Sequence, residues 1–338
     1  MSPSGLALSP SRRFSARIWA TSRRKSALPC SKIALNSAKL GRHCRASDPG
    51  TRELAKKHRD YFITVDNDGL PTNEIGPWAE EKYQYVGMYA QLFSTGMKNK
   101  WAHRIYLDLF SGPGYSRVRD TDRVVRGSPM IALSLPDRFD SYVFADENAE
   151  SLDALRTRVS RLGHSVTPTY IPGDANKKVG RVLEVISKTP SNSTLSFCFL
   201  DPYKLNIHFE TVRRIAEGRA VDFLILLALY IDANRNVSFY VAEGNRTIDL
   251  FLGDANWRQR WKPAQHAGDT IVEFLANEYS TRMRQIGYLP MSIEHMVKIR
   301  THDRRLPLYY LAFFSKHETG LEFWDEVRKY ATDQLILL

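Results

Sequence analysis

Four aspartates stand in this 338-residue sequence where short apolar runs end: Asp108, Asp146, Asp174 and Asp201. If these runs are neighbouring parallel strands, their carboxyl ends meet at one edge of the sheet, which is where ligands bind in open α/β sheets. Carboxylates at that edge can accept hydrogen bonds from the hydroxyl and amine groups of a ligand. Each aspartate could instead cap a helix. The series of four favours one shared ligand site over four separate caps.

The first of these runs leads into a glycine-containing loop, Asp108-Leu109-Phe110-Ser111-Gly112-Pro113-Gly114. Glycine lets a backbone approach a ligand closely. A dinucleotide would need a third glycine where its pyrophosphate meets the helix N-terminus, but position 117 is Arg. S-adenosylmethionine has no phosphate, so the loop predicts this cofactor, bound near Phe110, Gly112 and Gly114. Asp108 would meet its ammonium group, directly or through water.

The next two strand ends supply partners for the rest of that cofactor. A carboxylate at Asp146, or at its neighbour Glu147, can accept hydrogen bonds from both ribose hydroxyls. Asp174 and Asn176, in Gly173-Asp174-Ala175-Asn176, can meet the adenine amino group. Helix capping remains the alternative at these positions.

The fourth strand end, Asp201-Pro202-Tyr203, indicates the chemistry. The exocyclic amine of a base is a poor nucleophile because its lone pair is delocalised into the ring. A carboxylate and a backbone carbonyl that accept its hydrogen bonds return electron density to nitrogen, and an aromatic ring can stack on the base. We therefore interpret Asp201, Pro202 and Tyr203 as catalytic. The usual amino-methyltransferase pattern has two prolines between the acid or amide and the aromatic residue, whereas this sequence has one. This difference weakens the case for a nucleic-acid amine, and a plain turn is the alternative.

Two further segments each allow two interpretations. Arg126-Gly127-Ser128-Pro129 could line the pocket or form a turn. Trp257 and Trp261, four residues apart and beside Arg and Lys, could stack on bases or belong to an ordinary core. The nine histidines form no close pair, so we expect no metal site.

The elements that would position these residues alternate between short apolar runs and amphipathic stretches. We expect strands over 105–110, 141–145, 169–171, 195–200 and 221–229, and helices over 148–162, 176–188 and 208–217. This alternation indicates βαβ units and a parallel sheet. A stripe of residues at helical spacing predicts an earlier helix: Trp78, Lys82, Tyr85, Tyr89, Leu92 and Phe93.

After the fifth strand, residues 232–290 are longer than one crossover helix needs, and we expect a helical insertion there with one amphipathic helix near 269–286. Strands at 295–300 and 308–315 and a helix near 320–333 follow. The predicted fold is a Rossmann-like class I methyltransferase fold. It has a mostly parallel, doubly wound sheet, a C-terminal antiparallel hairpin and an N-terminal helical segment.

The formal charge of +11 is concentrated at the N-terminus. Residues 1–47 carry ten Arg or Lys and no acid, so the remainder has 38 basic against 37 acidic residues. We expect residues 1–50 to form a basic, disordered tail and residues 51–338 to form the methyltransferase-like domain. The tail has the composition of an organellar transit peptide. A disordered extension, or upstream sequence read from a misplaced start, is the simpler alternative.

Three cysteines, of which two lie in the tail, form no disulfide framework and no zinc spacing. The longest apolar stretch, 223–231, falls well short of the roughly 20 residues that a membrane span needs. We therefore expect a cytoplasmic protein with no membrane association, or an organellar one if the tail is a transit peptide.

Over roughly residues 60 to 325, the chain resembles the three-Cys-motif partner protein family. The matching segments are Gly76-Pro77-Trp78-Ala79-Glu80-Glu81-Lys82, Met97-Lys98-Asn99-Lys100-Trp101, Tyr106 to Gly114, Gly127-Ser128-Pro129, Gly173-Asp174-Ala175-Asn176, Leu200-Asp201-Pro202-Tyr203 and Pro307-Leu308-Tyr309-Tyr310. The family is similar to class I methyltransferases and tends to be encoded beside a radical-SAM-like protein with three cysteines. The resemblance implies a methyltransferase-like fold and work with that partner, and it names no substrate.

Two functions follow from the sequence. The first is an S-adenosylmethionine-dependent methyltransferase that acts on a nucleic-acid base amine. The second is a non-catalytic or accessory protein that keeps the fold and serves the radical-SAM-like partner. The single proline after Asp201 and the nearly neutral body slightly favour the second.

Overall fold

The computed structural model describes residues 61, 63–163 and 167–336. All of the described residues belong to one compact unit. The predictions made for residues 1–50 lie outside the described residues.

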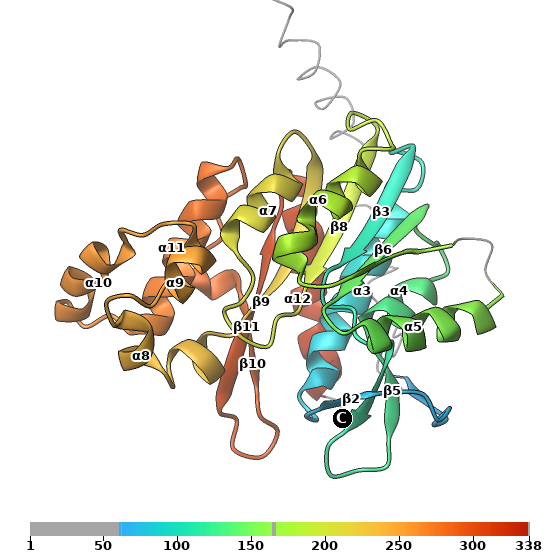
Figure 1. Ribbon diagram of the computed structural model, residues 1–338, viewed down its shortest axis with the longest axis horizontal. Helices are drawn as coiled ribbons and strands as arrows, with labels where there is room; N and C mark the ends of the chain where they lie inside the picture. Colours follow the sequence, from blue (N-terminus) through green and yellow to red (C-terminus); the bar gives the residue numbers. More distant parts are fainter. Residues whose placement is uncertain (1–60, 62, 164–166, 337–338) are drawn as a thin grey trace, which may run out of the picture. The chain divides into compact units, whose positions relative to one another are not determined.

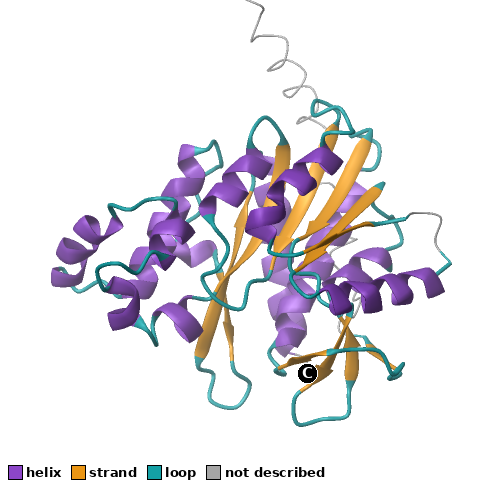
Figure 2. Ribbon diagram, viewed as in Figure 1, coloured by secondary structure: helices purple, strands orange, loops and turns teal. Residues whose placement is uncertain are grey.

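Seven strands form the larger sheet, in the order β7, β6, β3, β8, β9, β11, β10 (Figures 1 and 2). The first five in this order run parallel, β11 is antiparallel to β9, and β10 is antiparallel to β11. This order confirms the Rossmann-like class I methyltransferase fold predicted from the sequence. The bounds are β3 His103–Asp108, β6 Ser141–Asp146, β7 Thr169–Pro172, β8 Thr194–Leu200, β9 Ala220–Leu227, β10 Val297–Arg300 and β11 Pro307–Phe314.

Helices cover both faces of this sheet, and all seven residues of the central strand β8 are therefore buried. α3, α4 and α12 pack together on one face, and α6 and α7 pack together on the other (Figure 1). The bounds are α3 Ala79–Met97, α4 Ser128–Leu133, α5 Ala149–Arg161, α6 Ala175–Ile186, α7 Phe209–Ala216 and α12 Glu318–Ile336.

The predicted strands and helices are confirmed to within two or three residues at their ends. The difference that matters most for the site is at the end of β3, which is at Asp108 and not at Phe110 as predicted. The Asp108 carboxylate accepts a hydrogen bond from the Phe110 N–H at 3.2 Å and so turns the chain out of the sheet. Leu109 and Phe110 therefore belong to the glycine loop.

The predicted aromatic stripe on α3 is the centre of the core. Tyr89 is fully buried, and its ring lies 4.9 Å from that of Phe197 on β8 and 4.5 Å from that of Phe313 on β11. Its hydroxyl donates a hydrogen bond to Asp222 at 2.7 Å. This satisfies the hydroxyl and a buried carboxylate together. Lys82 continues the same face of the helix toward the site.

A second, four-stranded sheet was missed by the sequence reading. Its strand order is β1, β5, β4, β2, with bounds β1 Thr64–Val65, β2 Asn73–Ile75, β4 Tyr115–Val118 and β5 Val124–Arg126. β4 and β5 form a hairpin between the glycine loop and α4, and β2 pairs parallel to β4. Strands of two to four residues are too short to show alternation, and the β2–β4 pairing joins segments about 40 residues apart.

One buried arginine fixes the N-terminal segment against the glycine loop. Arg158 on α5 is 2% exposed and forms an ion pair with Asp68 at 2.6 Å. It also donates hydrogen bonds to the carbonyls of Leu70, Pro71 and Pro113. Because Pro113 lies within the glycine loop, this single guanidinium joins α5, the loop and the chain that leads into β2.

The predicted insertion after β9 is helical. A short π-helical turn (Leu229–Ala233) leads into α8 Val237–Val241, α9 Thr247–Leu252, α10 Trp257–His266 and α11 Ile271–Gln285 (Figure 2). The predicted helix near 269–286 is α11, which begins with a capping box between Thr270 and Glu273. Among the described residues, no helix is both long enough and apolar enough to cross a membrane.

We expect Arg158→Ala to lower the free energy of unfolding by about 3–5 kcal/mol, because it leaves Asp68 and three carbonyls without their buried donor. Arg161 is the matched control. It lies on the same helix and pairs with the same Asp68, but its side chain is 54% exposed, so Arg161→Ala should cost about 1 kcal/mol or less. Urea unfolding of the two variants measures both. Equal losses of unfolding free energy in the two variants would show that Arg158 does not fix the N-terminal segment against the glycine loop.

Candidate functional site

A cavity of about 1060 Å³ runs along the carboxyl edge of the parallel strands. The glycine loop, the ends of β6 and β8 and the start of α6 all line it. Three of the four predicted aspartates, Asp146, Asp174 and Asp201, line this one cavity. The arrangement that the sequence predicts for these three strand ends is therefore present.

The glycine loop needs glycine at both predicted positions. Gly112 has φ +58° and Gly114 has φ +87°, in the left-handed region that side chains disfavour. A Cβ on Gly112 would lie 2.8 Å from the Asn73 side-chain amide, and one on Gly114 would lie 2.7 Å from Leu155. Phe110 is partly buried and lines the cavity beside them.

Asp146 ties the loop to the second strand. One carboxylate oxygen accepts the Gly112 N–H at 2.7 Å, and the other accepts the Asn148 N–H at 2.9 Å. A carboxylate has about four acceptor positions, so each oxygen keeps one for a ligand. The neighbouring Glu147 also lines the cavity but is exposed.

Asp108 lies behind the cavity wall. It is fully buried, does not line the cavity, and accepts a hydrogen bond from the Ser128 hydroxyl at 2.6 Å. Burial raises the pKa of Asp108 to about 7, although the hydrogen bonds from Ser128 and the Phe110 N–H favour the ionised form. Asp108 therefore shapes the site through Ser128 and the loop backbone.

The segment Gly127-Ser128, for which a turn was the competing interpretation, is part of the wall. Both residues line the cavity. The Gly127 N–H donates to the Gly114 carbonyl at 2.7 Å, and Ser128 opens α4 and reaches Asp108. The pocket interpretation is confirmed for these two residues. The sequence could not distinguish a pocket wall from a turn here, because a glycine and a serine after a short hairpin are common in both.

At the third strand end, helix capping does not use the whole carboxylate of Asp174, which also lines the cavity. Asp174 caps α6 with one oxygen, which accepts the Asn176 N–H at 2.8 Å, while its other oxygen has no partner among the described residues. Asn176 uses its whole amide inside the protein. It accepts from the His208 N–H and the Thr211 hydroxyl and donates to Asp174 and the Asn206 carbonyl. Asn176 thus holds the loop after β8 against α6.

The fourth strand end has a partner that the sequence reading missed. The Asp201 carboxylate forms an ion pair with Lys82 of α3, whose side chain is only 8% exposed. Burial disfavours the charged ammonium, but the Asp201 carboxylate outweighs it and raises the pKa of Lys82. A lysine at a position of an otherwise apolar helical stripe was the available signal, since such a lysine needs a buried partner.

Next to this ion pair, Pro202 is buried and Tyr203 is 67% exposed, and both line the cavity. A large exposed aromatic side chain at the wall of a cavity is available to stack on a flat ligand. Asp201, Pro202 and Tyr203 therefore lie together, on the same cavity as the glycine loop.

The chain that leads into α3 supplies a further wall. Asn73, Ile75 and Trp78 line the cavity, and the Arg119 guanidinium lies 6.0 Å from the Trp78 ring. The sequence reading assigned no role to residues 64–76. The insertion also reaches the site, because Thr247 and Leu250 of α9 line the cavity.

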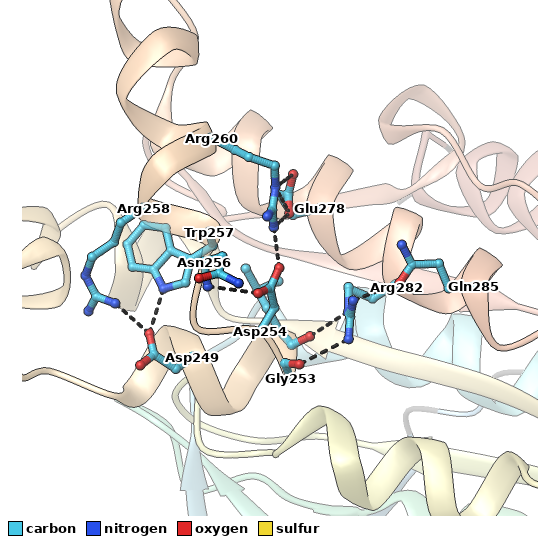
Figure 3. A network of polar contacts seen from close by, with 11 residues as sticks. Asp249, Gly253, Asp254, Asn256, Trp257, Arg258, Arg260, Glu278, Arg282 and Gln285 are labelled. Atoms are coloured by element: carbon cyan, nitrogen blue, oxygen red, sulfur yellow. Dashed lines mark hydrogen bonds and ion pairs between the residues drawn. The ribbon is translucent and has the colours of Figure 1, made fainter. Parts of the chain in front are cut away.

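In the Trp257–Lys262 segment, the two tryptophans belong to the core of the insertion, and the two arginines join a network of polar contacts (Figure 3). Trp257 is fully buried and Trp261 is 4% exposed, so neither can stack on a base. The Trp257 indole N–H and the Arg258 guanidinium both donate to Asp249, at 2.8 and 2.6 Å. Arg260 pairs with Asp254 and Glu278. The base-stacking interpretation is wrong, and the core interpretation is confirmed.

The described residues contain no group of three or more His, Cys, Asp or Glu side chains placed to hold a metal ion. The one cysteine within them, Cys198, is buried in β8.

Comparison with known proteins finds similarity to solved methyltransferase structures. No family model and no curated protein matches the chain. A putative O-methyltransferase from Klebsiella pneumoniae is 13% identical, with a TM-score of 0.37, over 84% of this chain and 97% of that one. The O-methyltransferase TomG from Streptomyces achromogenes, solved with SAM, is 11% identical, with a TM-score of 0.35, over 75% and 92%. An S-adenosylmethionine-dependent methyltransferase from Clostridium acetobutylicum is 16% identical, with a TM-score of 0.26, over 45% and 54%.

These likenesses are too distant to carry a substrate to this chain. The assignment of the fold rests on its own strand order, with the antiparallel β11 between β9 and β10.

The raised pKa of Asp108 predicts how stability depends on pH. A carboxyl that binds its proton more tightly in the folded state stabilises the protein at low pH, and this contribution is lost as pH rises from about 4 through about 7. The unfolding free energy of the wild type, relative to Asp108→Asn, should therefore fall by on the order of 2–4 kcal/mol between pH 4 and pH 8. Urea unfolding at several pH values measures this difference. A difference that stays constant with pH would contradict the assignment.

Proposed function

We propose that this chain is an S-adenosylmethionine-dependent methyltransferase that acts on the amine of a nucleic-acid base. The observation that carries the proposal is the meeting of two groups of residues on one cavity. The glycine loop and Asp146 lie on one part of its wall, and Asp201-Pro202-Tyr203 lies on another. A cofactor site and an acceptor site in one cavity are what group transfer requires.

The residues present fit the cofactor. Gly112 and Gly114 line the cavity and carry no side chain, so the loop backbone can lie against a ligand. Asp146 keeps an acceptor position on each oxygen for a pair of ribose hydroxyls. The free oxygen of Asp174 can accept a hydrogen bond from the adenine amino group. When bound, S-adenosylmethionine supplies an electrophilic methyl group on a positively charged sulfur.

Two of the residues predicted to bind the cofactor act through their neighbours in this proposal. Asp108 is separated from the cavity, so it orients Ser128 and the glycine loop. Asn176, with all four hydrogen-bonding positions used, holds the loop that carries Asp201 and Tyr203. Both are positioning residues.

On the acceptor side, one oxygen of Asp201 is held by Lys82, and the other accepts no hydrogen bond from any described residue. That free oxygen can accept a hydrogen bond from an amine and so raise the electron density on its nitrogen. Tyr203 can stack on the base that carries the amine. The substrate amine therefore meets a fixed carboxylate and a ring, and its geometry is set before the reaction.

An accessory role beside a radical-SAM-like protein is the second candidate, and it follows from the resemblance to the three-Cys-motif partner family. The ion pair between Lys82 and Asp201 favours this role in one respect. One oxygen of the Asp201 carboxylate, which we assign to the acceptor site, already has a partner within the protein. Cofactor binding without methyl transfer to DNA or RNA would support this role.

Asp146→Ala should weaken the binding of S-adenosylhomocysteine by about 2–4 kcal/mol, because two charge-assisted hydrogen bonds are lost. Glu147→Ala is the control, since Glu147 also lines the cavity but, among the described residues, has no hydrogen bond to the glycine loop. Calorimetry measures both affinities, and thermal melting shows that each variant is folded. Unchanged affinity in Asp146→Ala, or an equal loss in Glu147→Ala, would refute the assignment of Asp146 to the ribose.

Asp201→Ala should lower turnover roughly 10²-fold or more and leave the affinity for S-adenosylhomocysteine nearly intact. Because this change also leaves the Lys82 ammonium buried without its partner, Asp201→Asn is the conservative comparison. Asn keeps an acceptor oxygen and should retain more turnover than Ala. Labelled methyl transfer and calorimetry give the two quantities. A large loss of cofactor affinity in both variants would remove Asp201 from the acceptor role.

A further inference from the structure

Lys82 is the buried charged group in the site that the cofactor does not explain. It comes from α3, lines the cavity and pairs with the one carboxylate assigned to the acceptor. No residue of the predicted cofactor site contacts it. Burying an ammonium is costly unless it is paired, so its position next to Asp201 calls for a role.

The hydrogen-bonding capacity of the pair is only partly used. An ammonium has three N–H donors. One goes to Asp201, and the Tyr83 ring lies 4.8 Å from Nζ. Tyr83 and Tyr309 also interact electrostatically with the ammonium, but among the described residues the hydrogen bond to Asp201 is the one that Lys82 donates. The other oxygen of Asp201 is also unpartnered among the described residues. The pair therefore presents at least one donor and one acceptor, side by side, at the wall of the cavity.

This donor and acceptor match a particular chemical edge, and they lie beside the exposed ring of Tyr203. We propose that Lys82 and Asp201 together select a base whose exocyclic amine stands next to an unprotonated ring nitrogen, as in adenine and cytosine. Asp201 accepts from the amine, and Lys82 donates to the ring nitrogen. The inference rests on the proposed function and adds the identity of the base, with Lys82 as the specificity-determining residue.

The same pair disfavours the other bases. Uracil and thymine carry a carbonyl where the amine would be, so an acceptor would face the Asp201 carboxylate. Guanine has an unprotonated ring nitrogen on one side of its amine, but a single carbon separates that nitrogen from the one that bears the sugar, so the sugar would lie against Lys82. The ring nitrogen on the other side is protonated, a donor that would face the Lys82 ammonium. A site that pairs its polar groups with one edge rejects an edge that leaves them unpaired.

The first test identifies the methylated nucleoside. The full chain is incubated with labelled S-adenosylmethionine and single-stranded DNA and RNA of random sequence, and the digested nucleosides are resolved by mass spectrometry. We expect label on the amine of adenosine or cytidine nucleosides. Label on uridine, thymidine, guanosine or the sugar would overturn this inference and leave the methyltransferase proposal standing. No label in either nucleic acid would overturn the proposed acceptor class, and this inference with it.

The second test removes the ring nitrogen and keeps the amine. Oligonucleotides carry adenine or 1-deazaadenine, or cytosine or 3-deazacytosine, at one position. The wild type should prefer the natural base by about 10- to 100-fold in kcat/KM, because the analogue leaves Lys82 without an acceptor. Lys82→Met should lose this preference, and Lys82→Arg should keep part of it.

Lys98→Met is the matched control, because Lys98 lies at the other end of α3 and pairs with Asp137 at the surface. It should keep the full preference. Fluorescence anisotropy of the same oligonucleotides on protein saturated with S-adenosylhomocysteine gives a readout independent of turnover. Equal use and equal binding of the natural base and its analogue by the wild type would contradict the proposal, even if Lys82→Met failed to fold.

Discussion

The parallel pairing of β3 with β6 and β8, and of β6 with β7, is the constraint on which the site depends. Parallel strands end at one edge of a sheet, so residues about 90 positions apart in sequence come to line one cavity. The Gly112 N–H closes this edge by donating to Asp146, which joins the loop after β3 to the end of β6. A change of register between β3 and β6 would separate the glycine loop from the Asp146 carboxylate that orders it.

A second layer holds that edge in place. Arg158 fastens the chain before β2 to the glycine loop, Asn176 fastens the loop after β8 to α6, and Lys82 fastens α3 to Asp201. Each tie uses a buried or half-buried polar side chain whose partners come from distant elements. The residues that contact a ligand can therefore be few, because their backbones are fixed by groups outside the cavity or at its rim.

The sequence was sufficient for the large sheet, because its strands are apolar on both faces and alternate with amphipathic helices. It also brought Asp146, Asp174 and Asp201 to one cavity, since strand-end residues can be found once the strands are known. It could not separate Asp108 from the cavity, because its burial depends on the hydrogen bonds that it accepts from the Ser128 hydroxyl and the Phe110 N–H, and Ser128 is 20 residues away in the chain. It missed Arg158 and the small sheet, because each depends on pairing between residues distant in the chain, which leaves no local pattern. For Lys82, the stripe on α3 indicated that the lysine needs a buried partner, but not that the partner is Asp201.

The cavity beside the glycine loop fits S-adenosylmethionine and not a dinucleotide. The feature that separates the two ligands is the loop, which lacks the third glycine that a pyrophosphate needs, because an acid such as Asp146 suits the ribose of either one. The most direct measurement is a calorimetric titration of the full chain with S-adenosylhomocysteine, repeated in the presence of NAD. We expect binding at a single site that NAD does not displace. Displacement by NAD, or the absence of any S-adenosylhomocysteine binding, would contradict it.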